Sequence, residues 1–167
     1  GSDVLLEGAT ITATGNEQGG LVRIGGQFRG GKPVAPNDTA AGDYTKRFGS
    51  VPGLAAARTT TIDAATKINV SASQSNGIGG TVVVWSDSAT RMQGTVDATG
   101  GKRGGAVEIS SRTSLVEVTL SLLKIGKGGK LLLDPENIDV DQNYAQQLSD
   151  LLVGQGADVT LQASNDI

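Results

Sequence analysis

The 167-residue sequence contains neither cysteine nor histidine. Without cysteine, the chain has no disulfide bonds, no thiolate metal ligands and no cysteine nucleophile. Without histidine, it also lacks the commonest metal ligand, the usual general base and any Ser-His-Asp triad. A catalytic site in this chain would therefore depend on carboxylates, lysine or tyrosine.

Bulky apolar side chains are also scarce. Aromatic residues make up 3% of the sequence, whereas glycine accounts for 25 of the 167 residues, roughly twice its usual share. Such a chain can fill a thin interior with small aliphatic side chains, but not a broad two-layer core. It has no run of about 18 apolar residues, so no membrane-spanning helix is predicted. The net charge of −3 is too small to indicate a nucleic-acid partner.

Four Gly-Gly pairs each precede a short alternating apolar stretch. The second glycines of these pairs are Gly20, Gly80, Gly105 and Gly129. The intervals between them are 60, 25 and 24 residues. A further short stretch of strand-like residues lies upstream, as in residues 9–13, 67–72 and 94–98. A unit of about 24–25 residues with two or three strands therefore repeats along the chain.

This repeat predicts an all-β chain in which residues 1–167 form one parallel β-helix of about 24–25 residues per coil. Neighbouring coils would stack at about 4.8 Å, and the glycines would lie at corners that need positive φ or close backbone approach. A sandwich of antiparallel hairpins also has short strands, but it does not explain the constant interval. Because the last residues resemble the opening of another strand without a polar cap, we expect a longer parent array.

Residues 27–61 form an excursion within the 60-residue interval. They hold three of the four prolines, three of the five aromatic residues, and five basic residues against two acids. Proline cannot donate to a strand ladder, so a loop is predicted here. Long loops on rigid scaffolds often carry function; the alternative is a loop that only covers the flank. Its rings and guanidinium groups suit sugars and acidic groups. The candidate ligand-binding residues are Phe28, Arg29, Lys32, Tyr44, Lys46, Arg47 and Phe48, together with Trp85.

Residues 143–153 show helical rather than alternating spacing. Tyr144, Leu148, Leu151 and Leu152 recur at i, i+4, i+7 and i+8. Asp141 is a suitable N-cap, and Gly154 ends the pattern. The sequence predicts one short inserted helix that closes over one side of a coil, after which a strand resumes at residues 158–163.

Several strings of the sequence resemble the filamentous-haemagglutinin-like exoproteins of Gram-negative bacteria, large adhesins exported by two-partner secretion. The strings are residues 79–87 with Thr90 and Gly94, residues 104–110, residues 128–138, and the predicted helix followed by residues 154–167, with a weaker match at residues 22–26. The resemblance implies a right-handed β-helix, an outer-membrane two-partner transporter as export partner, and adhesion at the cell surface. The absence of cysteine suits passage of an unfolded chain. The family's amino-terminal secretion domain is missing from this sequence, so the resemblance is to a downstream segment.

Two smaller groupings each have a functional and a structural interpretation. Trp85 beside Asp87 resembles a sugar platform, but Trp85 ends a strand and packing is favoured. The acids from Asp139 to Asp150 copy the spacing of an EF-hand, yet Tyr144 stands where the sharp turn needs glycine. Capping and strand-end acids explain the same residues. We predict no metal and no cofactor, with calcium near Asp139 and Asp141 left open.

Three further acids, Asp63, Asp87 and Asp97, are candidates for a carboxylate pair on one face, which glycoside hydrolysis requires. Stacked acids facing solvent are the simpler interpretation. Asp134-Pro135 is chemically labile, but a proline that ends a strand accounts for it. Gly25-Gly26 has no following helix and no Lys-Thr, which excludes a phosphate-binding loop.

Two classes of function remain. The first is a non-enzymatic, secreted or cell-surface adhesin segment that attaches to glycans, a host surface or biofilm matrix. The second is a polysaccharide-cleaving β-helix enzyme, since the fold alone does not separate the two. A pure structural spacer in an adhesin shaft is a third possibility. The sequence favours the first, because charged residues do not cluster in successive coils around a common point.

Overall fold

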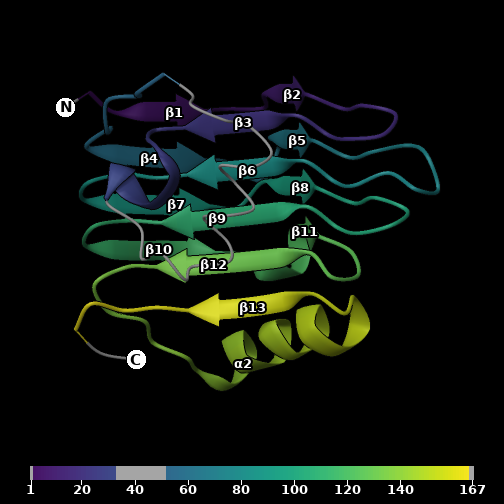
Figure 1. Cartoon of the computed structure of the whole chain (residues 1–167). Helices are drawn as coiled ribbons and strands as arrows, with labels where there is room; N and C mark the ends of the chain where they lie inside the picture. The colour runs from purple at the N-terminus through teal and green to yellow at the C-terminus, as the bar shows by residue number, and fades with distance from the viewer. Residues whose placement is uncertain (1, 33–51, 166–167) are drawn as a thin grey trace.

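The computed structural model describes residues 2–32 and 52–165, and these residues are mostly β-structure in three sheets (Figure 1). The first sheet contains β1 (Val4–Leu6), β4 (Thr59–Ile62), β7 (Ala89–Met92) and β10 (Ser114–Val118). The second contains β2 (Thr10–Thr12), β5 (Lys67–Asn69), β8 (Thr95–Asp97) and β11 (Leu123–Lys124). The third contains β3 (Leu21–Ile24), β6 (Thr81–Val84), β9 (Ala106–Ser110), β12 (Lys130–Asp134) and β13 (Asp158–Leu161).

From β1 to β12, successive strands enter the first, second and third sheets in rotation, and every pair between described strands is parallel. In the third sheet Leu21 pairs with Thr81, Thr81 with Ala106, and Ala106 with Lys130. These pairs reproduce the 60-, 25- and 24-residue intervals between the Gly-Gly pairs. The prediction of a mostly β chain with parallel strands is therefore confirmed, and the hairpin sandwich is wrong for the described strands.

The interior between the sheets is aliphatic and narrow, as the shortage of aromatic residues predicts. Alternate residues of each strand point inward, as Val82 and Val84 do in β6. The fully buried part of this cluster includes Ile62, Ile68, Met92, Val96, Ile109, Leu123 and Leu133. Tyr144, at one end of the stack, is the only aromatic residue packed against it among those described.

The first glycine of the first three Gly-Gly pairs, unlike Gly128 with its φ of 64°, lies where two successive passes of the chain nearly touch. A Cβ atom on Gly79 would stand 1.8 Å from the carbonyl oxygen of Ala98, and one on Gly19 would stand 1.8 Å from that of Val70. Neither glycine has a positive φ. Close backbone approach, rather than left-handed conformation, is therefore the reason for glycine at these corners.

The three sheets differ in how their outer faces are covered. Strands of the first and second sheets alternate between buried and more exposed residues, as in β7 and β8. In the third sheet, all four residues of β6 are buried, as are the last four of β9 and of β12. The middle strands of the third sheet are therefore covered on both faces, which explains their nearly continuous apolar runs.

One helix follows β12, where two strands would otherwise continue the first and second sheets. It consists of α2 (Gln142–Ser149) and a wider turn, η3 (Asp150–Gly154), so the helix predicted at residues 143–153 is confirmed. Asp141 caps it, because its carboxylate accepts the Tyr144 N–H at 2.7 Å. Leu148 and Leu151 are buried, but Leu152 is 48% exposed, contrary to its place in the apolar pattern.

The helix also closes the open edge of the second sheet. The Gln155 side chain accepts the N–H groups of Ile125 (2.8 Å) and Gly126 (3.2 Å), and its own NH2 donates to the Leu123 carbonyl at 2.7 Å. One side-chain amide thus makes the bonds that a neighbouring strand would make to β11. In Figure 1, α2 lies at the end of the stack beyond β11 and β12.

Candidate functional site

The excursion enters and leaves the β-structure at a corner that is short elsewhere. Ile24 pairs with Val84, and Val84 with Ile109; on the other side of the corner Thr59 pairs with Ala89, and Ala89 with Ser114. Four residues join the paired positions in the next two passes, namely residues 85–88 and 110–113.

Residues 25–58 join the same positions in the first pass, so the excursion is an insertion into a four-residue corner. The Ala57 N–H donates to the Gly25 carbonyl at 2.7 Å and closes the base of the insertion. Without residues 27–56, the corner would again consist of four residues, so these residues are the insertion. The sequence placed the end at residue 61, but Thr59–Ile62 form β4.

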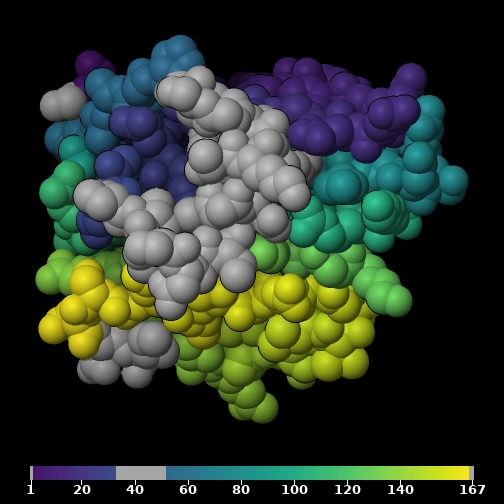
Figure 2. Space-filling view, in the orientation of Figure 1, coloured from purple at the N-terminus to yellow at the C-terminus, as the bar shows by residue number. Residues whose placement is uncertain are grey.

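The first turn of the excursion is η1 (Phe28–Gly31), which lies on the outer face of the third sheet against β9. Arg29, Gly30 and Gly31 all have left-handed backbones, with φ of 51°, 63° and 75°. This conformation turns the Arg29 N–H toward the sheet. Figure 2 shows this face, with the N-terminal residues at one end and the β13 region at the other.

Glu108 of β9 holds this turn in place. Its two carboxylate oxygens accept the Arg29 N–H at 2.9 and 3.0 Å, and Glu108 itself is only 2% exposed. Asp134 of β12, 8% exposed, lies on the same face, because it pairs in register with Ser110, two residues after Glu108. The charge of Asp134 is one of the causes that raise the pKa of Glu108, so the two carboxyl groups share one environment.

Burial dominates the electrostatics of these two acids. Desolvation raises the pKa of Glu108 to about 8, although the Arg29 N–H, the Ser110 hydroxyl and the Arg29 charge act in the opposite direction. The pKa of Asp134 is also raised by burial, against the opposing charges of Lys32 and Arg29. Burial therefore favours the protonated form of Glu108, which belongs to a group of two acids and two bases.

Three of the predicted ligand-binding residues are part of this turn. Lys32 is exposed, while Phe28 and Arg29 are half-buried. The Arg29 guanidinium lies 5.7 Å from the centre of the Phe28 ring, within the range of a cation–π contact. Tyr44, Lys46, Arg47 and Phe48 lie outside the described residues.

Trp85 is withdrawn from the candidate ligand-binding residues, because the indole is buried and only 1% exposed. Gly26 and Gly30 lie directly against its ring, and a Cβ atom on either would come within 2.4 Å of an indole carbon. Trp85 therefore packs between the third sheet and the excursion. The packing interpretation of this residue is the correct one.

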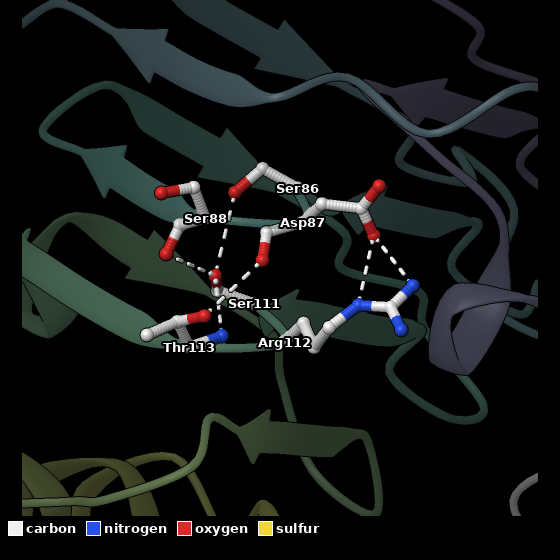
Figure 3. Close-up of polar contacts among 6 residues, drawn as sticks. All are labelled: Ser86, Asp87, Ser88, Ser111, Arg112 and Thr113. Atoms are coloured by element: carbon white, nitrogen blue, oxygen red, sulfur yellow. Dashed lines mark hydrogen bonds and ion pairs between the residues drawn. The ribbon is translucent and has the colours of Figure 1, made fainter. Parts of the chain in front are cut away.

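Asp87 does not accompany Trp85 to a common surface. At the corner drawn in Figure 3 its carboxylate accepts hydrogen bonds from Arg112 Nε (3.1 Å) and Nη2 (2.8 Å). Behind this ion pair, the Ser86 hydroxyl is 3.4 Å from the Ser111 hydroxyl, which donates to the Ser88 carbonyl at 3.1 Å. The corner is a ladder of small polar side chains that joins successive passes of the chain.

The other candidate acids do not converge either. Asp63 accepts the N–H groups of Gly8 and Thr66 at a different corner, and Asp97 accepts the Thr99 N–H at the end of β8. Hydrogen bonds, first that of the Thr66 hydroxyl, lower the pKa of Asp63. No group of three or more potential metal ligands occurs within residues 2–32 and 52–165.

Sequence reasoning missed Glu108 and Asp134. Their neighbours carried a usable signal, since Val83 and Leu132 occupy outward positions next to Glu108 in the sheet and are apolar. Apolar residues on both faces of a strand indicate cover on both faces. An acid in such a row is expected to be buried and to need a partner.

No known protein family, curated protein or solved structure matches this chain. Among the residues that the structure describes, no helix is long and apolar enough to cross a membrane.

Proposed function

We propose that this chain is a section of a secreted or cell-surface adhesin whose parallel strands form a right-handed β-helix. The rotation of strands through three sheets and the regular intervals between paired residues support the β-helix. The resemblance to filamentous-haemagglutinin-like exoproteins suggests the handedness, export through an outer-membrane two-partner transporter, and surface location.

Within this section, the excursion is proposed to contact the ligand, a glycan or a host or matrix surface that carries anionic groups. The observation that carries this proposal is the corner between Ile24 and Thr59, where 30 residues are inserted into a join that otherwise needs four. An insertion of this kind is free to vary without changing the strands around it, which is how rigid scaffolds present binding loops.

The charge of the excursion suggests the ligand class. The inserted residues 27–56 carry four basic and two acidic residues in a chain of net charge −3. Part of this positive charge, on Arg29 and Lys32, faces Glu108 and Asp134. We expect binding of sulfated or uronate-containing polysaccharide that weakens as salt is added.

Replacing residues 33–51 with a short Gly-Ser linker tests this proposal. The replacement removes Tyr44, Lys46, Arg47 and Phe48 but keeps η1 and its bonds to Glu108. We expect an unchanged far-UV circular dichroism spectrum and a melting temperature within a few degrees of the parent. We also expect loss of binding to heparin at low salt, because the adjacent bases Lys46 and Arg47 are removed, although Asp38 and Asp43 leave with them. Retained heparin binding by the folded variant would refute the role of the excursion, and absence of binding by the parent chain would favour a spacer.

The second candidate function is polysaccharide cleavage, and the Glu108–Asp134 pair is the observation that favours it. Two carboxyl groups on adjacent strands, one with a pKa raised to about 8, are the groups that a glycosidase needs. However, Glu108 is 2% exposed and its oxygens accept the Arg29 N–H, so η1 would have to leave before a substrate could reach it. Release of reducing or unsaturated sugar ends by the parent chain, abolished in Glu108→Gln, would establish the enzyme.

A further inference from the structure

A groove of about 730 Å³ opens where the first sheet ends, between β10 and α2. The third sheet continues to β13 and Gln155 closes the edge of the second, whereas β10 pairs only with β7 among the described strands. The volume lies within the range of about 300–1,000 Å³ that is typical of small-ligand sites.

The floor of this groove is apolar and its walls are polar. Leu115, Val118 and Tyr144 are half-buried and pack against the core, and Ile138 is buried. Burial raises the pKa of Tyr144 to about 12, so its phenol remains neutral and can donate a hydrogen bond. A floor of this kind suits the less polar face of a sugar ring.

The walls are dense in amides and carboxylates. The amides are Gln93, Asn137, Asn143, Gln146 and Gln147, and the carboxylates are Glu117, Asp139, Asp141 and Asp150. No lysine or arginine lines the groove among the described residues. Amides donate and accept, so this lining matches a ligand with many hydroxyl groups and opposes an anionic one.

Some of these wall side chains are held by hydrogen bonds within the protein, while others are available to bind a ligand. The Gln147 side chain accepts the Ser121 N–H at 3.1 Å, and Gln146 donates to Asp150 at 2.9 Å. Asp139 and Asn143 are exposed, and within the described residues their side chains make no hydrogen bond or ion pair. The two residues therefore keep their full bonding capacity for a ligand.

A β-bulge in β10 makes this edge of the first sheet different from a regular open sheet edge. Val116 and Glu117 together stand opposite Arg91, and Glu117 has a φ of 54°. The bulge turns the Glu117 carboxylate to Arg91 and to Gln93, which donates to it at 3.1 Å. A disrupted edge is a poor template for an added strand, so a peptide in β-pairing is the less suitable occupant.

We propose that the groove between β10 and α2 binds a neutral oligosaccharide. The apolar floor contacts the sugar rings, and Asn143 and Asp139 bond to hydroxyl groups at the rim. This site is separate from the excursion and differs from it in ligand class, because the excursion is basic and the groove contains only acidic charges. Neutral ligands form no ion pairs, so binding here is expected to be insensitive to salt.

The test uses the full chain and three neutral hexasaccharides, built from β-1,4-linked glucose, α-1,4-linked glucose and β-1,4-linked N-acetylglucosamine. Titration calorimetry and amide chemical-shift mapping are expected to detect binding of at least one, with shifts at Gln93, Ser121 and Asn143. The double variant Asp139→Ala, Asn143→Ala is expected to bind at least tenfold more weakly. The matched control Gln142→Ala, an exposed neighbour on the same helix that does not line the groove, is expected to bind like the parent.

Other outcomes would overturn the proposal. They are the absence of binding of all three hexasaccharides at millimolar concentration, equal affinity of the double variant and the parent, and shifts confined to residues outside the groove. Preferential binding of a basic peptide would assign the groove to a protein partner instead. The variant with residues 33–51 replaced is expected to keep groove binding, which distinguishes failure of this proposal from failure of the proposed excursion function.

Discussion

Both carboxylate oxygens of Glu108 accept the backbone N–H of Arg29, although the two residues are 79 positions apart in the sequence. The bond joins the outer face of the third sheet to the first turn of the excursion. Because Glu108 is buried and its pKa is raised to about 8, the attachment of the excursion is coupled to a proton. The main consequence is a dependence of stability on pH.

We predict that Glu108→Gln flattens the pH dependence of stability. The raised pKa means that, between the ordinary value of 4.5 and about 8, the folded protein keeps a proton that the unfolded chain has lost. The stability contributed by this proton is complete below pH 4.5 and falls as pH rises toward 8, by roughly 1.4 kcal/mol per unit at most. Asp134, whose pKa is also raised, acts in the same direction.

Urea unfolding of parent and variant at pH 5 and pH 8 measures this effect. We expect the parent to lose stability between the two values, and Glu108→Gln to lose less and to be the more stable protein at pH 8. Glu7→Gln, an exposed glutamate on another part of the chain, serves as the control and is expected to behave like the parent. Equal pH dependence in all three proteins would contradict the burial of an ionisable Glu108.

Trp85 provides a spectroscopic prediction, because it is the only tryptophan and it packs against Gly26 and Gly30. Deleting residues 27–56 leaves a four-residue corner, so we expect the strands to persist. The deletion also uncovers the indole together with Val83 and Leu132. We therefore expect a red shift of fluorescence, greater acrylamide quenching and a lower melting temperature, with an unchanged β-type far-UV spectrum. An unshifted emission would show that the excursion does not cover Trp85.

The order of strands and the register of the third sheet could be predicted because the chain repeats one local pattern. Gly-Gly pairs mark corners whose backbones nearly touch, and the distance between such pairs sets the register of parallel strands. The helix could be predicted in the same way, from Asp141 to Gly154. These signals are local in the sequence, and the Gly-Gly signal is repeated in successive passes of the chain.

The group formed by Glu108, Asp134, Arg29 and Lys32 could not be predicted from local signals. Its environment is made by η1, which is distant in sequence, and alternation alone assigns Glu108 to an exposed position. The burial of Trp85 against Gly26 and Gly30 could not be specified either, because these glycines lie far from it along the chain. The groove depends on where α2 lies relative to β10, which spacing does not specify. Only the apolar outward residues Val83 and Leu132 indicated that this face is covered.

Gly79 is predicted to tolerate no side chain. A Cβ atom there would stand 1.8 Å from the Ala98 carbonyl oxygen, which belongs to the backbone of the next pass and cannot move away alone. Gly79→Ala is expected to cost about 3 kcal/mol or more, because the neighbouring passes must separate. Gly154→Ala is the matched control, since nothing lies within 4 Å of its Cβ position, and it is expected to change stability by less than about 1 kcal/mol. Comparable destabilisation by the two substitutions would argue against close contact between the passes.

Gln155 is predicted to protect the edge of the second sheet. Its amide accepts from Ile125 and Gly126 and donates to Leu123, so Gln155→Ala leaves these backbone groups without partners. Each buried group that loses its partner costs about 1–3 kcal/mol, and we expect destabilisation of that order together with fast hydrogen exchange at the Ile125 amide. Gln155→Glu is expected to be intermediate, because a carboxylate still accepts both N–H groups but cannot donate to the Leu123 carbonyl. Gln142→Ala, at the exposed start of α2, is the control for the loss of a glutamine from this segment. If the Ile125 amide stays protected in Gln155→Ala, water or another side chain must satisfy the edge of β11, and the helical segment is then not what closes the second sheet.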